Sequence, residues 1–149
     1  SYTDGTTWGV ERANHKAIIT RDLQVNVCTL DAMTPTTKQT FEISYSANII
    51  SNSHVGNSWS YGLKHNDTFV YTCSTITIDV AEKFGPRFKI YAIEHDGDDD
   101  YGSETMRFPP LEIGNTISLT QQVIITENGG RYTGHTACMQ FVVTITRIN

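Results

Sequence analysis

Alternation of apolar and polar residues is the property that most limits how this chain of 149 residues can fold. In the stretch 139–145 every second residue is apolar: Met139, Phe141, Val143 and Ile145. Successive side chains of a β-strand point to opposite faces, so this pattern predicts a strand that buries one face. The same period recurs along the chain, whereas no long stretch follows the 3.6-residue period of a helix. Strands are predicted at 8–13, 18–30, 40–50, 57–63, 68–80, 87–95, 116–126 and 131–147.

The number of predicted strands and the turn residues between them indicate the fold class. Asn128 and Gly129 stand between the last two predicted strands. Both residues tolerate the positive φ of a tight hairpin turn, so we expect such a turn at 127–130. About eight strands with alternating faces indicate an all-β fold, either an antiparallel β-sandwich or a jelly roll. The length suits a single domain that spans residues 1–149.

Acidic residues are concentrated in one short stretch. The chain has 16 Asp and Glu against 11 Lys and Arg, and six of the acids fall within residues 94–104, where no Lys or Arg occurs. Like charges this close repel one another, so the cluster indicates oxygen ligands gathered around a hard cation such as calcium. The alternative is a solvated loop that binds no metal. The expected metal ligands are Asp96, Asp98, Asp99 and Asp100.

Charge and composition narrow the classes of partner. The formal net charge is −5 and no basic block occurs, so nucleic-acid binding is not expected. Thr, Ser and Asn are frequent, as in many secreted proteins, and Asn66 begins an Asn-Asp-Thr glycosylation sequence. We therefore expect a secreted or extracellular protein with a glycosylation site at Asn66. Chance occurrence of this triplet is the alternative.

Three cysteines, Cys28, Cys73 and Cys138, are spaced too widely for a zinc ribbon or a redox Cys-x-x-Cys motif. Their odd number allows at most one internal disulfide with one thiol left over. Three reduced cysteines are the alternative.

Aromatic residues beside polar ones provide candidate contacts to a glycan. Trp59 and Tyr61 lie in a stretch rich in Gly, Ser and Asn, and Tyr101 lies inside the acidic cluster. Such rings can stack on sugars while neighbouring polar groups bind the hydroxyls. The alternative is that Trp59 and Tyr61 pack on the sandwich, because aromatic side chains most often bury apolar area.

Residues 66–111 carry the pattern of a known family. An Asn-containing turn leads into Phe69, an irregular connection follows, and a strand then ends in the acidic, Gly-containing loop of 88–102. This order resembles the second half of a C-two domain, the calcium- and phospholipid-binding β-sandwich, with 23–47 as an earlier strand pair. The resemblance implies a calcium-dependent contact to a phospholipid head group. The chain departs from the family in offering only Asp31 in the earlier acidic loop, so Asp96, Asp98 and Asp100 would act alone.

Catalysis is not expected. The five histidines are scattered, and neither His-x-x-x-His nor Gly-x-Ser-x-Gly occurs. We expect a non-catalytic extracellular module that recognises a glycan or a phospholipid head group with the help of calcium, through loops at one end of the sandwich. The alternative is a structural or assembly subunit that forms a homo-oligomer through its strand edges.

Overall fold

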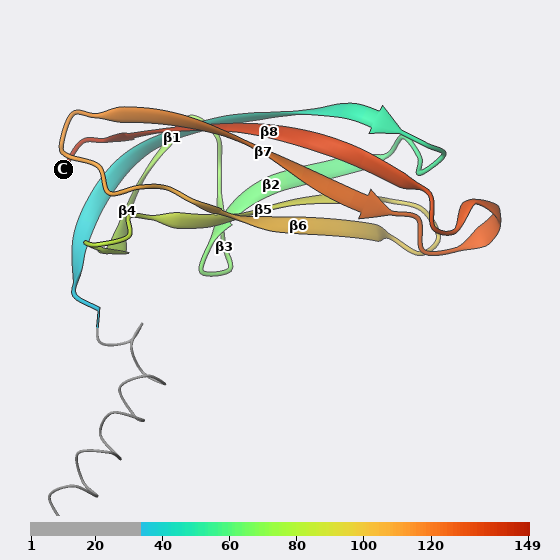
Figure 1. Ribbon diagram of the computed structural model, residues 1–149, viewed down its shortest axis with the longest axis horizontal. Helices are drawn as coiled ribbons and strands as arrows, with labels where there is room; N and C mark the ends of the chain where they lie inside the picture. The colour runs from blue at the N-terminus through green and yellow to red at the C-terminus, as the bar shows by residue number, and fades with distance from the viewer. Residues whose placement is uncertain (1–33) are drawn as a thin grey trace, which may run out of the picture. The chain divides into compact units, whose positions relative to one another are not determined.

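The computed structural model describes residues 34–149. The chain divides at Pro35, and the unit Thr36–Asn149 consists of two layers of β-strands (Figure 1). The strands predicted at 8–13 and 18–30 lie outside the described residues, as do Cys28 and Asp31. What we expect of them, and of one domain over 1–149, stays a prediction. No segment of residues 34–149 forms a helix with the length and hydropathy that crossing a bilayer requires.

Eight strands build the two sheets, and every ladder between them is antiparallel. The first sheet has the order β4-β1-β8-β7 and the second the order β3-β2-β5-β6. The prediction of an all-β antiparallel sandwich of about eight strands is confirmed. The strands are β1 (Thr36–Asn52), β2 (Trp59–His65), β3 (Thr68–Val70), β4 (Ser74–Ala81), β5 (Arg87–Glu94), β6 (Asp100–Arg107), β7 (Thr116–Thr126) and β8 (Thr136–Arg147).

The hydrophobic core lies between the sheets and is formed by the inward side chains of both. On β8 the four alternating residues of 139–145 are at most 2% exposed, which confirms the predicted inward face. Each such buried side chain stabilises the fold by about 1.5–3 kcal/mol relative to exposure. On the facing sheet β5 contributes Phe88, Ile90 and Ala92.

The prediction of one strand over 68–80 is wrong, because two short strands occupy this stretch and belong to different sheets. β3 pairs with β2, while β4 pairs with β1. Between them Cys73 adopts a positive φ of 59°, which turns the chain from one sheet to the other. The hydroxyl of Thr72 accepts a hydrogen bond from the Tyr45 N–H (2.9 Å) and donates one to the Tyr45 carbonyl (3.1 Å). These two hydrogen bonds of the Thr72 side chain therefore take the place of the backbone pairing that the turn interrupts.

The acidic stretch forms a shorter loop than the sequence suggests. β5 ends at Glu94, and β6 already begins at Asp100, so the connection is only 95–99. No strand was predicted in 100–107, because its inward positions include Asp100 and Gly102 and so show no apolar alternation. Tertiary pairing with β5 along its whole length forms the strand.

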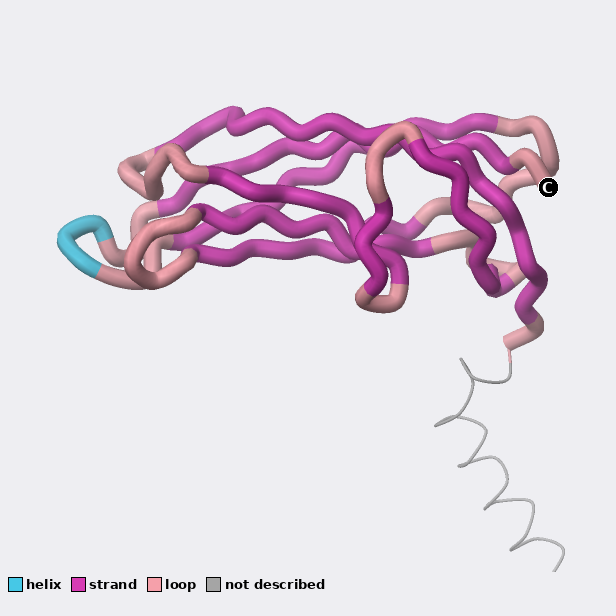
Figure 2. Tube along the Cα trace, turned by 180° about the vertical axis from the view of Figure 1, so that it is seen from behind, coloured by secondary structure: helices cyan, strands magenta, loops and turns pink. Residues whose placement is uncertain are grey.

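The tight Asn-Gly turn predicted at 127–130 is also wrong. The connection between β7 and β8 covers 127–135 and contains a short 3-10 helix, Gly130–Tyr132, drawn in cyan in Figure 2. Asn128 does not close a hairpin turn. Its backbone N–H binds the Asp100 carboxylate (2.9 Å), and its side-chain amide binds the Asp99 carbonyl (2.8 Å).

Gly102 allows the two sheets to meet along one edge. β6 and β7 belong to different sheets, and the carbonyl of Ile124 lies where a side chain of Gly102 would begin. A Cβ at this position would overlap that carbonyl and would lie 3.0 Å from Val123 Cγ1. The missing side chain therefore sets how closely β6 approaches β7.

We expect Gly102→Ala to destabilise the protein by about 1–3 kcal/mol, the usual cost of overpacking a tight contact. Gly97→Ala is the matched control, because a Cβ at Gly97 meets nothing within 4 Å. Its effect should stay within about 0.5 kcal/mol, as for most surface substitutions. Urea unfolding of both variants measures the difference, and equal stabilities would contradict the proposed role of Gly102.

Candidate metal centre

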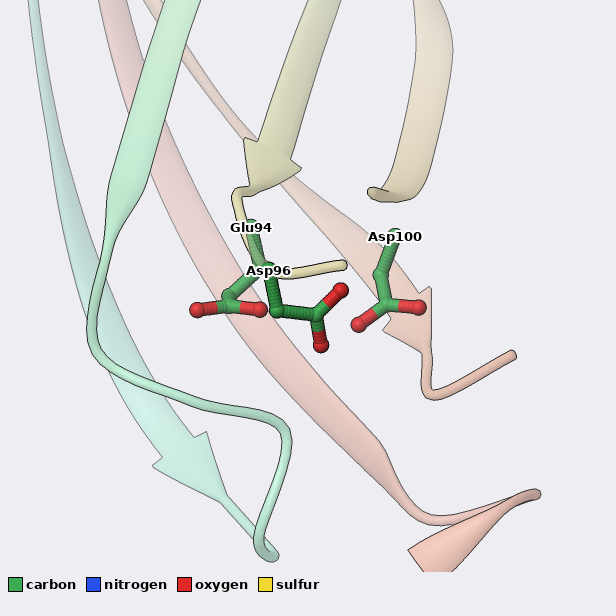
Figure 3. A group of neighbouring side chains, drawn as sticks. All are labelled: Glu94, Asp96 and Asp100. Carbon is green, nitrogen blue, oxygen red and sulfur yellow. The ribbon is translucent and has the colours of Figure 1, made fainter. Parts of the chain in front are cut away.

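Three acidic side chains meet at one end of the sandwich. Glu94, Asp96 and Asp100 each offer a carboxylate oxygen, and these oxygens lie within 4.8 Å of one another. Figure 3 shows the carboxylates of Asp96 and Asp100 turned toward each other, with the Glu94 carboxylate beside Asp96. These three residues are called the acidic triad below.

The strand register brings two members of the triad together. Glu94 is the last residue of β5 and Asp100 the first of β6, and the two are direct cross-strand partners. Both occupy inward positions, and Glu94 continues the row that begins with Phe88, Ile90 and Ala92. Like charges directly opposite each other destabilise a sheet. At about 4 Å they repel by roughly 4 kcal/mol for an effective dielectric constant of about 20.

Each of the two buried carboxylates has one oxygen with a hydrogen bond and one without. Glu94 is 3% exposed and Asp100 is 1% exposed. Glu94 Oε2 accepts a bond from the Ser58 N–H (3.1 Å), and Asp100 Oδ1 accepts the bond from Asn128. Glu94 Oε1 and Asp100 Oδ2 are buried without a partner. Such atoms cost free energy, because water no longer solvates them and no protein donor replaces it.

The loop that follows β1 covers the Glu94 carboxylate. Gly56 has a φ of +134°, and a Cβ at this residue would overlap the carboxylate of Glu94. The Gly56 carbonyl accepts hydrogen bonds from the Asn52 side chain (2.6 Å) and from the Trp59 indole N–H (3.1 Å). These bonds hold the loop in place, so the backbone of Gly56 shields Glu94 from solvent.

Glu127, a fourth acid, borders the triad. It follows β7 and is 8% exposed. Burial raises the pKa of Glu127, and the charges of Asp100, Asp96 and Glu94 act in the same direction. A hydrogen bond from the Gly129 N–H opposes these effects and lowers the pKa. Burial and the neighbouring negative charges together outweigh this hydrogen bond, so the pKa of Glu127 is raised above its ordinary value.

The composition of the triad matches a hard cation. Calcium binds six to eight oxygens at about 2.3–2.6 Å, so two of its ligands can be about 5.2 Å apart at most. The triad oxygens, within 4.8 Å of one another, satisfy this limit as they stand. Zinc prefers nitrogen and sulfur ligands, and the triad contains neither His nor Cys. The group can hold a cation, and its ligand atoms favour one that takes oxygen.

The four predicted metal ligands separate into two groups. Asp96 and Asp100 belong to the triad, whereas the carboxylates of Asp98 and Asp99 do not. Asp99 Oδ2 lies 3.2 Å from His95 Nδ1, and His95 Nε2 lies 2.8 Å from the Ser60 hydroxyl. The exposed Asp98 donates its backbone N–H to Asp96 Oδ1 (3.0 Å), which supports the loop.

Sequence reasoning missed Glu94 and Glu127. The sequence did contain a signal for Glu94. It continues the row of alternate positions Phe88, Ile90 and Ala92, so its side chain is expected to point toward the core. No comparable signal existed for Glu127. Its place beside the triad depends on the contact between β6 and β7, which belong to different sheets.

The three predicted ligand-binding aromatics do not form one surface. Trp59 is partly buried against the core, and Tyr61 packs edge-to-face on Phe141 at 5.8 Å between ring centroids. Tyr101 lies on β6 and is 52% exposed. Its cross-strand partner is Ile93, whereas that of Trp59 is Glu94, so the two rings leave the sheet on opposite faces.

The predicted glycosylation site and two of the cysteines lie within the described residues. Asn66 is exposed at the tip of the β2–β3 hairpin, where it and Asp67 adopt positive φ values of 47° and 66°. This conformation explains the Asn-Asp pair as a hairpin turn and leaves the side chain accessible. Cys73 is exposed and Cys138 is buried, and the two are not bonded to each other.

Neither a protein-family model nor a curated protein matches the chain. The resemblance to the C-two domain therefore stays a prediction.

The raised pKa of Glu127 predicts how stability depends on pH without calcium. A carboxyl whose pKa is higher in the folded state stabilises the fold when protonated, and this contribution disappears as pH rises through the folded-state pKa. In chelator, the free energy of unfolding should therefore decline above the ordinary Glu pKa of about 4.3. Glu127→Gln should flatten this decline, and the control Glu112→Gln, at an exposed residue, should not. Urea titrations between about pH 4.5 and 7.5 test this, and identical slopes in all three proteins would contradict it.

Proposed function

We propose that the unit Thr36–Asn149 is a non-catalytic calcium-binding module. One observation carries this proposal: Glu94 Oε1 and Asp100 Oδ2 are buried and unpartnered inside the acidic triad. A calcium ion bound by the triad would neutralise its carboxylates and would give both oxygens a partner. It thereby removes the repulsion and the desolvation cost of the apo state.

Recognition of a ligand follows from the number of protein oxygens. With one ligand oxygen from each residue, the triad offers fewer than the six to eight that calcium takes, so coordination positions remain for water or for a ligand. A sugar hydroxyl or a phosphate oxygen of a phospholipid head group suits these positions. The exposed Asp96 marks the side from which such a ligand approaches. We further propose that the module acts outside the cell, in keeping with the accessible Asn66.

Burial of the carboxylates argues against glycoside hydrolysis. Retaining glycosidases also use two carboxyl groups, about 5–5.5 Å apart, but both must reach the sugar. Glu94 is covered by the backbone of Gly56, and Asp100 is 1% exposed. The covered carboxylates are better suited to hold a metal ion than to contact a sugar ring on both sides.

The test compares thermal or urea unfolding with calcium and with chelator. Calcium at a hundredfold its dissociation constant should stabilise the wild-type protein by about 2.7 kcal/mol. Glu94→Gln and Asp100→Asn should abolish this gain, because each removes a charged ligand. In chelator the same variants should equal or exceed the wild type in stability, because they remove the repulsion between residues 94 and 100.

Asp98→Asn is the matched control, because it removes an equal charge from the same loop outside the triad. It should keep the full response to calcium. A wild-type protein whose stability is the same with calcium and with chelator would contradict the proposal. A response lost equally in all three variants would show that loop charge, and not the triad, attracts the ion.

A further inference from the structure

The outer face of the sheet β3-β2-β5-β6 carries a cluster of cations. Arg87 and Arg107 are direct cross-strand partners on β5 and β6, and Lys64 and Lys89 are direct partners on β2 and β5. Lys89 follows Arg87 by two residues, so all four side chains leave the sheet on the same side. These four residues are called the basic cluster below.

No acidic side chain among the outward residues of β2, β5 and β6 compensates the positive charge of the basic cluster. The outward residues of β2, β5 and β6 are Ser60, Gly62, Lys64, Arg87, Lys89, Tyr91, Ile93, Tyr101, Ser103, Thr105 and Arg107, without Asp or Glu. Within the described part of the chain none of the four cations forms an ion pair. Like charges directly opposite each other destabilise a sheet, so the cluster works against stability in the isolated protein.

Aromatic rings continue the same face toward the acidic loop. Gly62 on β2 lies between Phe69 on β3 and Tyr91 on β5, and a Cβ at Gly62 would overlap the ring of Phe69 and lie 2.7 Å from the Tyr91 hydroxyl. Phe69 and Tyr91 therefore extend over the bare backbone of β2. Tyr91 is stacked against Tyr101 at 6.5 Å between ring centroids, and Phe69 packs edge-on against Tyr71 at 4.7 Å. The four rings form a row across the sheet.

The basic cluster and the aromatic row are joined. The Lys64 ammonium lies 5.0 Å from the centroid of the Tyr91 ring. Beyond Tyr101 the face ends at the acidic loop 95–99. Along the strands the face therefore changes from cationic, through aromatic and uncharged, to acidic.

We propose that this face binds an acidic polysaccharide, with its sulfate or carboxylate groups on the basic cluster and an uncharged part of its sugar chain on the aromatic row. Arg and Lys form charge-assisted hydrogen bonds with such groups, and the negative faces of aromatic rings attract the slightly positive C–H groups of sugars. The site is separate from the acidic triad, because Glu94 and Asp100 point to the inner side of the same sheet and Asp96 lies in the loop between them. Binding at this face does not require calcium.

Other anionic partners fit this face less well. Duplex DNA carries a charge about every 1.7 Å, and the acidic loop at one end of the face would repel it. A lipid surface requires apolar side chains that project beyond the cations. Phe69 and Tyr91 instead extend over the bare backbone of Gly62, and the more exposed rings of the row, Tyr71 and Tyr101, carry polar hydroxyl groups. A polysaccharide can place anionic groups at one end and neutral sugar at the other.

The experiment measures binding of a sulfated heparin octasaccharide by calorimetry, in chelator, to the full chain. The wild-type protein should bind, and the double variant Lys89→Gln/Arg107→Gln should bind about tenfold more weakly or worse, since it loses two charge-assisted contacts. Lys38→Gln/Arg131→Gln is the control, with the same two residue types removed from exposed positions elsewhere. It should keep wild-type affinity. Tyr101→Ser should weaken binding without any change in charge.

Three outcomes would overturn the proposal. Equal loss in the two double variants would mean that binding depends on total charge and not on this face. Tighter binding of single-stranded DNA or of phosphatidylserine vesicles would assign the face to another class of partner. Octasaccharide binding that requires calcium and is lost in Glu94→Gln, with the basic cluster intact, would transfer the site to the calcium centre.

Discussion

The close approach of β6 and β7 at Gly102 is the constraint on which the rest of the sandwich unit depends. The two strands lie in different sheets and share no hydrogen-bond ladder, so only the absence of a side chain lets their backbones touch. This contact joins the sheets along one edge and brings the loop after β7 beside the loop before β6. The bonds from Asn128 to Asp99 and Asp100 depend on it, as does the position of Glu127.

The acidic triad lies where stability alone would favour apolar residues. Glu94 and Asp100 occupy inward positions at the end of rows that are otherwise hydrophobic, and each leaves one oxygen without a partner. Residues that break the local rules of a fold without a structural gain are most often retained for a site. The basic cluster on the outer side of the same sheet breaks a second rule, with two like-charge pairs and no acid between them. Unfavourable charge arrangements therefore occur on both faces of this sheet.

The net charge of −5 conceals this separation of charge. Acids gather in the loops at one end of the second sheet, and cations gather at the other end of its outer face. Because strand pairing sets which side chains share a face, residues as distant in sequence as Lys64 and Arg107 contribute to one surface. No run of basic residues in the sequence indicated such a surface.

Local sequence determined the strands with strong alternation, and the inward row of β8 is the clearest example. Period two is a property of neighbouring residues, so it can be read without knowing which strands pair. The acidic stretch was likewise recognisable as a candidate site from composition alone, although only Asp96 and Asp100 of its predicted ligands joined the triad. Tertiary structure decided the remainder. Whether 68–80 forms one strand or two, whether Asp100 begins a strand, and where Asn128 donates its hydrogen bonds all depend on partners far away in the sequence. The physical reason is that a hydrogen-bond donor or a carboxylate takes its role from the group that faces it, and the packing of two sheets selects that group.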